Sequence, residues 1–298
     1  MAIQRKQLNI MKARRRVRLR SALLLSVLAC MVSLLFGAAM GLGGAVMPPV
    51  LQLILEAAVT VVAFGMTAYL GIFVLDGDQR KILPLFTLTR GQIFWLTMLG
   101  MLLTAPMTLM GDTLEALFLP QQAAIAGESG KLFLLTMVKS ALLVPVCEEL
   151  FFRGYLYQAL SRISKHRAML ISSLIFALAH GIGLYGFLPR IVLGMLLAAL
   201  MDKTGTLLAP MLVHGCYNAA IVIIAYSGAA PLFSGLGPMN CAFRLMLCIF
   251  CLYAFRRTWT TRGLKNPMRP LDELRFSKKE RLMIAAVALL VILAEVLS

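Results

Sequence analysis

Three short groups of ionisable and polar residues interrupt stretches of sequence that are otherwise strongly apolar. They are Glu148-Glu149-x-x-x-Arg153, Phe176-x-x-x-His180 and His214-x-x-x-Asn218. A charged side chain at the centre of a membrane helix costs about 2.5–3.5 kcal/mol. Such residues therefore persist mainly where they face one another across a bundle interior or a water-filled cavity. Acid, imidazole and amide groups in that setting predict a functional site.

The spacing of the histidines indicates how their side chains point. Residues four apart lie on the same face of a helix, so His214 and Asn218 are expected to point the same way. Phe176 and His180 have the same spacing and are expected to share a face. Taken singly, a buried histidine more often bonds a backbone carbonyl than takes part in chemistry, and Phe176 is interpreted as packing.

The acidic group divides into two residues with different surroundings. Glu149 and Arg153 are four apart and can form an ion pair within one helix, which could also be purely structural. Glu148 lies about 100° around the helix from Glu149. One glutamate can thus be held by the guanidinium while Glu148 projects into a cavity, free to act as a base.

Hydrolysis needs a base that deprotonates water and a group that stabilises the developing oxyanion, and some hydrolases also use a metal. Glu148 is the candidate base, aided by His180, and His214 and Asn218 are candidate hydrogen-bond donors to the oxyanion. Alternatively, Glu148, His180 and His214 bind zinc, because two histidines and one carboxylate form a catalytic ligand set with an open position. Both alternatives stay open.

The composition indicates an integral membrane protein. Of the 298 residues, 60% are hydrophobic and 14% are charged, whereas soluble domains are about 45–50% apolar and about 25% charged. Long, uniformly apolar runs satisfy their backbone hydrogen bonds in lipid only as helices. We therefore predict an all-α fold, a polytopic transmembrane bundle of about eight or nine membrane helices. The candidate spans are 21–41, 50–75, 92–111, 131–158, 168–187, 188–201, 207–228, 241–255 and 282–298.

Glycines and prolines interrupt part of this pattern of apolar spans. Gly181, Gly183, Gly186 and Pro189 interrupt the 168–201 region, which is expected to form two short or partly re-entrant helices. Two further prolines precede the polar groups, namely Pro145 and Pro210. Either they kink their helices and admit water, or they are simply tolerated in membrane helices.

The distribution of charge predicts the topology. The net charge is +16, and the Lys and Arg residues cluster in alternate loops, chiefly 1–20 and 256–281. This pattern follows the positive-inside rule and places the N-terminus in the cytoplasm and the acidic loop 112–130 outside. The same charge attracts anionic lipid head groups. No basic-aromatic surface accompanies it, so we predict no nucleic-acid binding.

Four segments follow from these patterns. They are a basic cytoplasmic N-terminus (1–20), N-terminal membrane helices (21–130), a catalytic helical core (131–228), and C-terminal membrane helices (229–298) with the basic loop 256–281. Three cations inside apolar stretches are expected to snorkel or to line water. These are assigned no role: Lys139, Arg190 and Arg244.

The three groups resemble the motifs of the CPBP family, the type II CAAX prenyl endopeptidases and bacteriocin-processing enzymes also called the Abi family. The motifs are carried by 148–154, 176–180 and 204–218, and the resemblance covers roughly 131–225. It implies an intramembrane endopeptidase whose helical bundle encloses a polar chamber. Carried over position by position, it implies Glu148 as the water-activating base with His180 as partner, His214 and Asn218 as the oxyanion or metal environment, and Glu149 and Arg153 as supports.

The resemblance leaves the cofactor and the substrate open. The family is named a metalloprotease group, but a glutamate mechanism without metal has also been argued for it, so zinc is one of two alternatives. The expected partner is a peptide or membrane-protein substrate, lipidated or not. The basic, compact chain looks bacterial, which predicts the plasma membrane and disfavours literal CAAX processing.

Two other classes of function compete with proteolysis. A catalytically silent membrane protein of the same fold could act in bacteriocin immunity or as a binding scaffold. A proton-coupled transporter would need paired hydropathy halves with broken helices, and the sequence has no such symmetry. Serine chemistry is disfavoured because no Gly-x-Ser-x-Gly-like nucleophile motif accompanies a buried histidine.

Overall fold

The described part of the chain is entirely helical apart from its turns. The computed structural model describes residues 2–43, 47–76, 85, 87–118, 130–161, 164–181, 184–260 and 277–297. No β-strand occurs among them, and each predicted span overlaps a helical stretch, which confirms the all-α membrane bundle. Five stretches are long and apolar enough to cross a membrane: Val17–Gly37, Pro49–Phe73, Arg90–Phe118, Leu208–Tyr226 and Pro238–Thr260.

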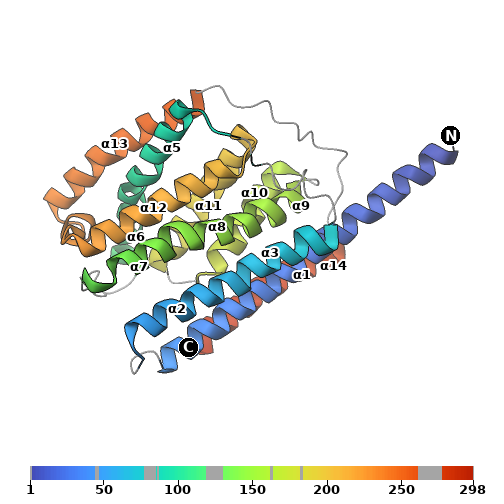
Figure 1. Cartoon of the computed structure of the whole chain (residues 1–298), viewed down its shortest axis with the longest axis horizontal. Coiled ribbons are helices and arrows are strands. Elements are labelled where there is room, and N and C mark those ends of the chain that lie inside the picture. The colour runs from blue at the N-terminus through green and yellow to red at the C-terminus, as the bar shows by residue number, and fades with distance from the viewer. Residues whose placement is uncertain are drawn as a thin grey trace.

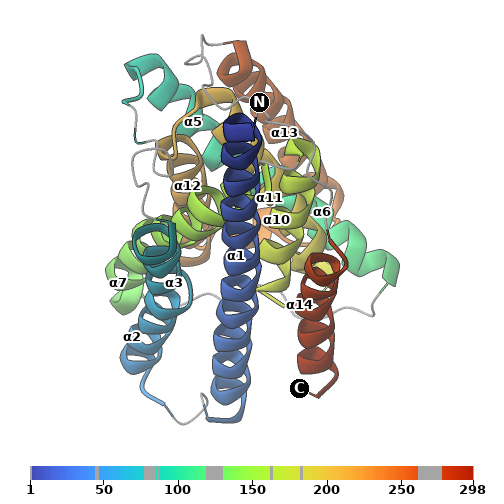
Figure 2. The same ribbon diagram turned by 90° about the vertical axis from the view of Figure 1, so that its right-hand side faces the viewer.

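One group of helices forms a flank of the molecule (Figures 1 and 2). In it α1 packs against α14 and against the segments η2 and η3. Figure 1 shows the N-terminal part of α1 extending beyond the other helices. Since α1 continues through residue 20, the expected boundary there is not a break in the helix. The elements are α1 (Ala2–Gly43), α2 (Pro49–Thr60), η2 (Val61–Met66), α3 (Thr67–Tyr69), η3 (Leu70–Asp76) and α14 (Lys278–Leu297).

A second group of helices surrounds α12, which packs against α5, α8, α11 and the segment η5. A capping box between Thr89 and Gln92 starts α5, since each side chain bonds the backbone N–H of the other residue. The bounds are α5 (Arg90–Leu102), α6 (Thr104–Phe118), α11 (Leu184–Thr204), α12 (Leu208–Tyr226), η7 (Ala230–Phe233) and α13 (Pro238–Thr260). The predicted loop 256–281 is shorter at its start because α13 runs to Thr260, and 261–276 lie outside the described residues.

The first part of the acidic loop expected at 112–130 is helical, and residues 119–129 lie outside the described residues. Helix α6 runs to Phe118, so Asp112 and Glu115 lie within it. Asp112 is buried, and one of its carboxylate oxygens accepts a hydrogen bond of 2.6 Å from Nη1 of Arg244 on α13. Arg244, which was assigned no role from the sequence, therefore forms an ion pair with Asp112, which was expected in the loop.

A continuous helical run from 130 to 161 carries the acidic motif between the two groups. Two stretches of it are wound as π-helix, a geometry that is rare and frequent at functional sites. The run comprises the 3₁₀ turn η4 (Gly130–Leu132), α7 (Phe133–Met137), the π-helical η5 (Val138–Leu143), α8 (Val144–Glu149), the π-helical η6 (Leu150–Tyr157) and α9 (Gln158–Ser161). The next helix is α10 (Lys165–Leu178), which packs closely against α11.

The glycine-rich region breaks at a different place from the one predicted. Helix α10 ends at Leu178 and α11 begins at Leu184, so the boundary expected at 187–188 lies inside α11. Gly181 adopts φ +88°, a left-handed conformation that favours glycine and ends helices. Pro210 lies in the first turn of α12, where a missing N–H breaks no helical bond, so it starts the helix rather than kinking it.

Candidate active site

The two adjacent glutamates of the acidic motif end α8 and are both buried. Glu149 is enclosed by an arginine and a histidine. Its Oε1 atom accepts hydrogen bonds of 2.8 Å from Nη1 of Arg153 and of 2.8 Å from Nδ1 of His214. The ion pair expected from the four-residue spacing is thus present, and it also binds an imidazole from α12.

Arg153 links this pair to two other elements. Its Nη2 atom donates to the carbonyl of Gly194 on α11 at 3.1 Å. The guanidinium carbon lies 4.7 Å from the centroid of the Phe176 ring, a cation–π contact. Neither the Arg153 nor the Glu149 side chain is exposed to solvent. A buried charge pair repays its desolvation through its hydrogen bonds. Both guanidinium Nη atoms make one here, whereas Nε of Arg153 and Oε2 of Glu149 have no partner among the described residues.

His180 lies beyond the end of α10 rather than on the helix, which corrects the expectation that it shares a helical face with Phe176. The turn at Gly181 folds the imidazole back, so that Nδ1 bonds the Phe176 carbonyl at 2.8 Å. A carbonyl only accepts, and Nδ1 therefore carries the proton. The Nε2 atom lies 3.3 Å from Oε1 of Glu148, and 28% of the side chain is exposed.

His214 approaches Glu148 from the opposite side. Because its Nδ1 bonds Glu149, its Nε2 atom is directed at Glu148, 3.9 Å from Oε2. Glu148 therefore lies between the Nε2 atoms of two imidazoles. Its Oε2 atom is buried and makes no hydrogen bond to the described residues. Oε2 of Glu149 and Nε of Arg153 are likewise buried without a partner among the described residues. Of the two free carboxylate oxygens, Oε2 of Glu148 is the one that faces an imidazole nitrogen beyond hydrogen-bonding distance, where a donor such as water would satisfy it.

Asn218 is one turn beyond His214 on α12 but is already engaged. Its Nδ2 atom donates to the carbonyl of Ser140 in η5 at 2.8 Å. The amide has a second N–H, which is the one donor that Asn218 still has for an oxyanion. The sequence could not indicate this bond, because it joins residues 78 positions apart.

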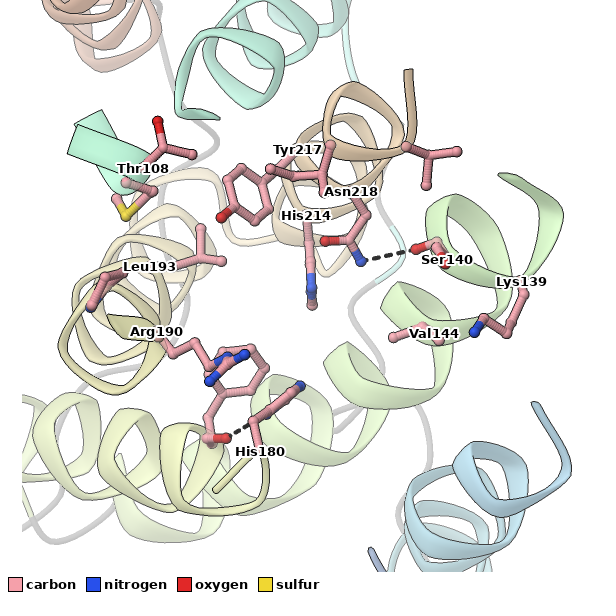
Figure 3. A pocket seen from close by; sticks show the side chains of 16 residues that line it. Thr108, Lys139, Ser140, Val144, His180, Arg190, Leu193, His214, Tyr217 and Asn218 are labelled. Carbon is pink, nitrogen blue, oxygen red and sulfur yellow. Dashed lines mark hydrogen bonds between the residues drawn. The ribbon is translucent and has the colours of Figure 1, made fainter. Parts of the chain in front are cut away.

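A cavity of about 430 Å³ lies beside these residues (Figure 3). Its size is that of a small-molecule or short-segment binding site. His180, His214 and Asn218 line it, together with apolar side chains such as Leu193 and Ile221. Figure 3 shows His214 pointing into this space from α12 and His180 at the opposite edge of it. Glu148 is not among the residues that line the cavity, so the expectation that it projects into one is not met directly, but both histidines that face it do line the cavity.

Aromatic rings hold the cluster in place. Phe176 is fully buried, as expected of a packing residue, and its centroid lies 5.1 Å from that of Phe152, 4.9 Å from that of His180 and 5.8 Å from that of His214. The contacts with Phe152 and His214 are edge-to-face, a favourable arrangement for aromatic pairs. One ring therefore touches both imidazoles and the Arg153 guanidinium.

Two of the cations that were expected to snorkel or to line water, and that were assigned no role, lie in the cavity wall, Lys139 and Arg190. Lys139 forms an ion pair with Glu56 of α2. Arg190 extends from the second turn of α11 into the cavity. The signal available in the sequence was a cation within an apolar stretch that also contains glycine and proline, which is the pattern of helices that line water.

The zinc alternative is not assembled as a ligand group in this structure. Among the residues that the structure describes, no three His, Cys, Asp or Glu side chains form a group that could hold a metal ion. The donor types and the direction of both Nε2 atoms suit zinc. The set Glu148, His180 and His214 therefore stays a prediction, and we derive no step through a metal.

Comparisons with known proteins agree with the resemblance carried by the motifs. A stretch of 77 residues is 32% identical to the UPF0177 protein YxdF of Lactococcus lactis, covering 26% of this chain and 42% of that protein's length. No solved structure significantly matches the chain. Residues 130–220, which contain all three motifs, match the family model described as type II CAAX prenyl endopeptidase Rce1-like, which confirms the predicted resemblance for this segment.

Proposed function

We propose that the chain is an intramembrane endopeptidase in which Glu148 activates the attacking water. The observation that carries this proposal is the position of Glu148 within 3.3 and 3.9 Å of the Nε2 atoms of His180 and His214, both of which line a cavity. The match of this segment to the Rce1-like family supports the reaction class. The Glu149–Arg153 pair acts as a support that orients His214.

The proton inventory around Glu148 follows from the hydrogen bonds. With Nδ1–H of His180 given to the Phe176 carbonyl, the Nε2 lone pair faces a carboxylate oxygen. Two acceptors at 3.3 Å are stable only if a proton lies between them. Glu148 and His180 thus share one proton, and this pair can receive a proton from water and later return it.

The reaction then proceeds in two steps. Water enters beside Oε2 of Glu148, loses a proton to the Glu148–His180 pair and attacks the carbonyl carbon of the bound peptide. The oxyanion accepts a hydrogen bond from the remaining N–H of Asn218, and a second one from Nε2 of His214 when that nitrogen carries a proton. The C–N bond then breaks, the pair returns a proton to the leaving amine, and the products are a carboxylate and an amine.

The membrane setting defines the class of substrate. The five candidate spans make the chain an integral membrane protein. We propose that its substrate is a peptide or membrane protein, lipidated or not, and that its N-terminus faces the cytoplasm of a bacterial cell. The basic segments 1–20 and 256–281 support this orientation and contact with anionic lipids.

The test compares membrane peptides from cells that contain the wild-type protein with those from cells that contain Glu148→Gln at equal abundance. We expect specific cleavage products with the wild type that are absent with the variant. Identical peptide profiles from folded, equally abundant proteins would contradict proteolysis and favour a binding scaffold. Metal analysis of the purified wild type and of His214→Ala tests the zinc alternative separately.

A further inference from the structure

The wall of the cavity carries more positive than negative charge. Among the described residues that line it, two are permanent cations, Lys139 and Arg190, and none is Asp or Glu. Lys139 is already paired with Glu56. None of the ion pairs or hydrogen bonds formed between described residues includes Arg190. Its guanidinium is therefore the cavity's unmatched charge.

Arg190 is held over the cavity by the helix that carries it. The guanidinium folds back along α11 onto Gly186, and a Cβ atom at that position would collide with Nη1 of Arg190. The bare α-carbon of Gly186 thus makes the space that the side chain occupies. A snorkelling arginine would instead extend toward the water interface. Figure 3 shows Arg190 directed into the space between His180 and Tyr217.

The electrostatic surroundings of Arg190 do not neutralise it. Glu148 and Tyr217 are close enough to interact with it, but neither forms an ion pair with it. Within 4 Å, Glu148 has only the two histidines as charged partners among the described residues. A guanidinium in a partly apolar cavity carries a desolvation cost that an anion with two acceptor oxygens would offset.

We propose that Arg190 binds a carboxylate of the substrate peptide and thereby sets which peptide bond reaches Glu148. This inference rests on the proposed proteolytic function, since it assigns the polar anchor of the same site. Arginine binds a carboxylate through two parallel N–H bonds, which fixes orientation as well as position. The carboxylate belongs either to the C-terminus of the peptide or to an acidic side chain.

Binding without turnover separates these sources. The Glu148→Gln protein is placed in phosphatidylcholine nanodiscs and incubated with three pools of random peptides. One pool has free C-termini and no acidic residues, the second is C-terminally amidated and contains Glu, and the third is amidated and lacks acidic residues. We expect one of the two carboxylate pools to be retained roughly tenfold or more above the neutral pool. The pool that is retained identifies the source.

Variants then assign the preference to Arg190. On the Glu148→Gln background, Arg190→Gln is expected to abolish the preference, and Arg190→Lys to keep part of it because the charge remains but the fork is lost. Lys203→Gln is the matched control, since it also removes a cation from α11. The Lys203 side chain lies over the Trp259 ring and is not part of the cavity wall. Gly186→Ala is expected to reproduce Arg190→Gln by displacing the guanidinium. In active protein, Arg190→Gln should raise KM for the preferred pool with little change in kcat.

Two results would overturn the inference. One is equal retention of all three pools, and the other is a carboxylate preference that survives Arg190→Gln in protein whose thermal unfolding is unchanged. Failure of the proposed function looks different, because the wild type would then cleave none of the pools. The binding comparison still decides the role of Arg190 in that case.

Discussion

Glu148 and Glu149 are neighbours in sequence with opposite surroundings. Glu149 accepts hydrogen bonds from a guanidinium and an imidazole, both fully buried or nearly so. Glu148 faces the Nε2 atoms of two imidazoles and no guanidinium, and each carboxylate has one oxygen without a donor among the described residues. Paired carboxylates with different environments commonly have different tasks. Glu148 is suited to proton transfer, and Glu149 is suited to holding His214.

Exchanging each acid for its amide separates these tasks. Glu149→Gln leaves Arg153 buried without a negative partner, so we expect it to lower the free energy of unfolding by about 3–5 kcal/mol. Glu148→Gln removes the base and is expected to slow cleavage by about 100-fold or more with a much smaller loss of stability. Thermal unfolding in detergent and cleavage assays measure the two effects. A larger loss of stability in Glu148→Gln than in Glu149→Gln, with cleavage kept in Glu148→Gln, would contradict these separate tasks.

Part of the site was predictable from the sequence. The Glu149–Arg153 pair follows from helical spacing alone, and the three motifs identify the polar residues. The bond between Glu149 and His214 joins residues 65 positions apart and depends on how closely α8 and α12 approach. The role of Arg190 depends on where its helix begins, which the sequence placed too late. Local periodicity in the sequence determines neither the approach of α8 to α12 nor the residue at which α11 begins.

The approach of α12 to the helical run at 138–149 is set by a glycine and a proline. Pro145 has no N–H for the carbonyl of Ala141 four residues before it. At Gly215, beside His214, an added Cβ would lie 2.6 Å from that carbonyl oxygen. The two helices can therefore pack with backbone nearly in contact, which brings His214 to Glu149.

Adding one methyl group at this contact tests its importance. We expect Gly215→Ala to force α12 away, lower stability by about 1–3 kcal/mol and reduce cleavage, because His214 moves from Glu149. The matched control is Gly91→Ala in α5, where an added Cβ meets nothing within 4 Å. The control should be neutral or slightly stabilising. Equal behaviour of the two variants, measured by thermal unfolding, would contradict the close approach.

The turn after α10 is a second element that positions a site residue. Gly181 has φ +88°, so Gly181→Ala strains the backbone by about 1–3 kcal/mol next to His180. Gly228, with φ +74° after the end of α12, gives a matched variant with similar strain. Both should lose stability, and only Gly181→Ala should lose cleavage per folded molecule. Loss of cleavage in both, or in neither, would contradict a positioning role for this turn.

The elements themselves were largely predictable, because long apolar runs in lipid leave few alternatives to helices. Their ends were less so. His180 was expected on a helix because its spacing from Phe176 is helical, yet the left-handed glycine ends α10 at Leu178. The four-residue spacing still brings the two residues together, because Nδ1 of His180 reaches the Phe176 carbonyl from the turn.

A second buried ion pair of the molecule lies away from the cavity. Arg244 is buried on α13 and donates to Asp112 of α6 and to the carbonyls of Phe233 and Gly235. This network joins two helices and the connection that follows α12. All four of its residues lie outside the Rce1-like match at 130–220, since Asp112 precedes that segment and Phe233, Gly235 and Arg244 follow it. We therefore assign it to stability.

Removing this network should affect folding and not turnover. Arg244→Met leaves Asp112 buried without its partner and is expected to cost about 3–5 kcal/mol of stability. The double variant Arg244→Met/Asp112→Leu should recover part of that loss, since no buried charge remains. The kcat of the folded fraction should match the wild type in both. A change in kcat at unchanged folded fraction would contradict a purely structural role.

The central claim is that Glu148 and His180 act as one proton-transfer unit. The most direct measurement is a double-mutant cycle on cleavage by purified protein, with Glu148→Gln, His180→Ala and the combined variant at equal folded fraction. The proposed mechanism predicts that each single variant loses nearly all activity and that the combined variant is no slower than either, as expected of residues that work together. Losses that multiply, or a single variant with wild-type turnover, would contradict it.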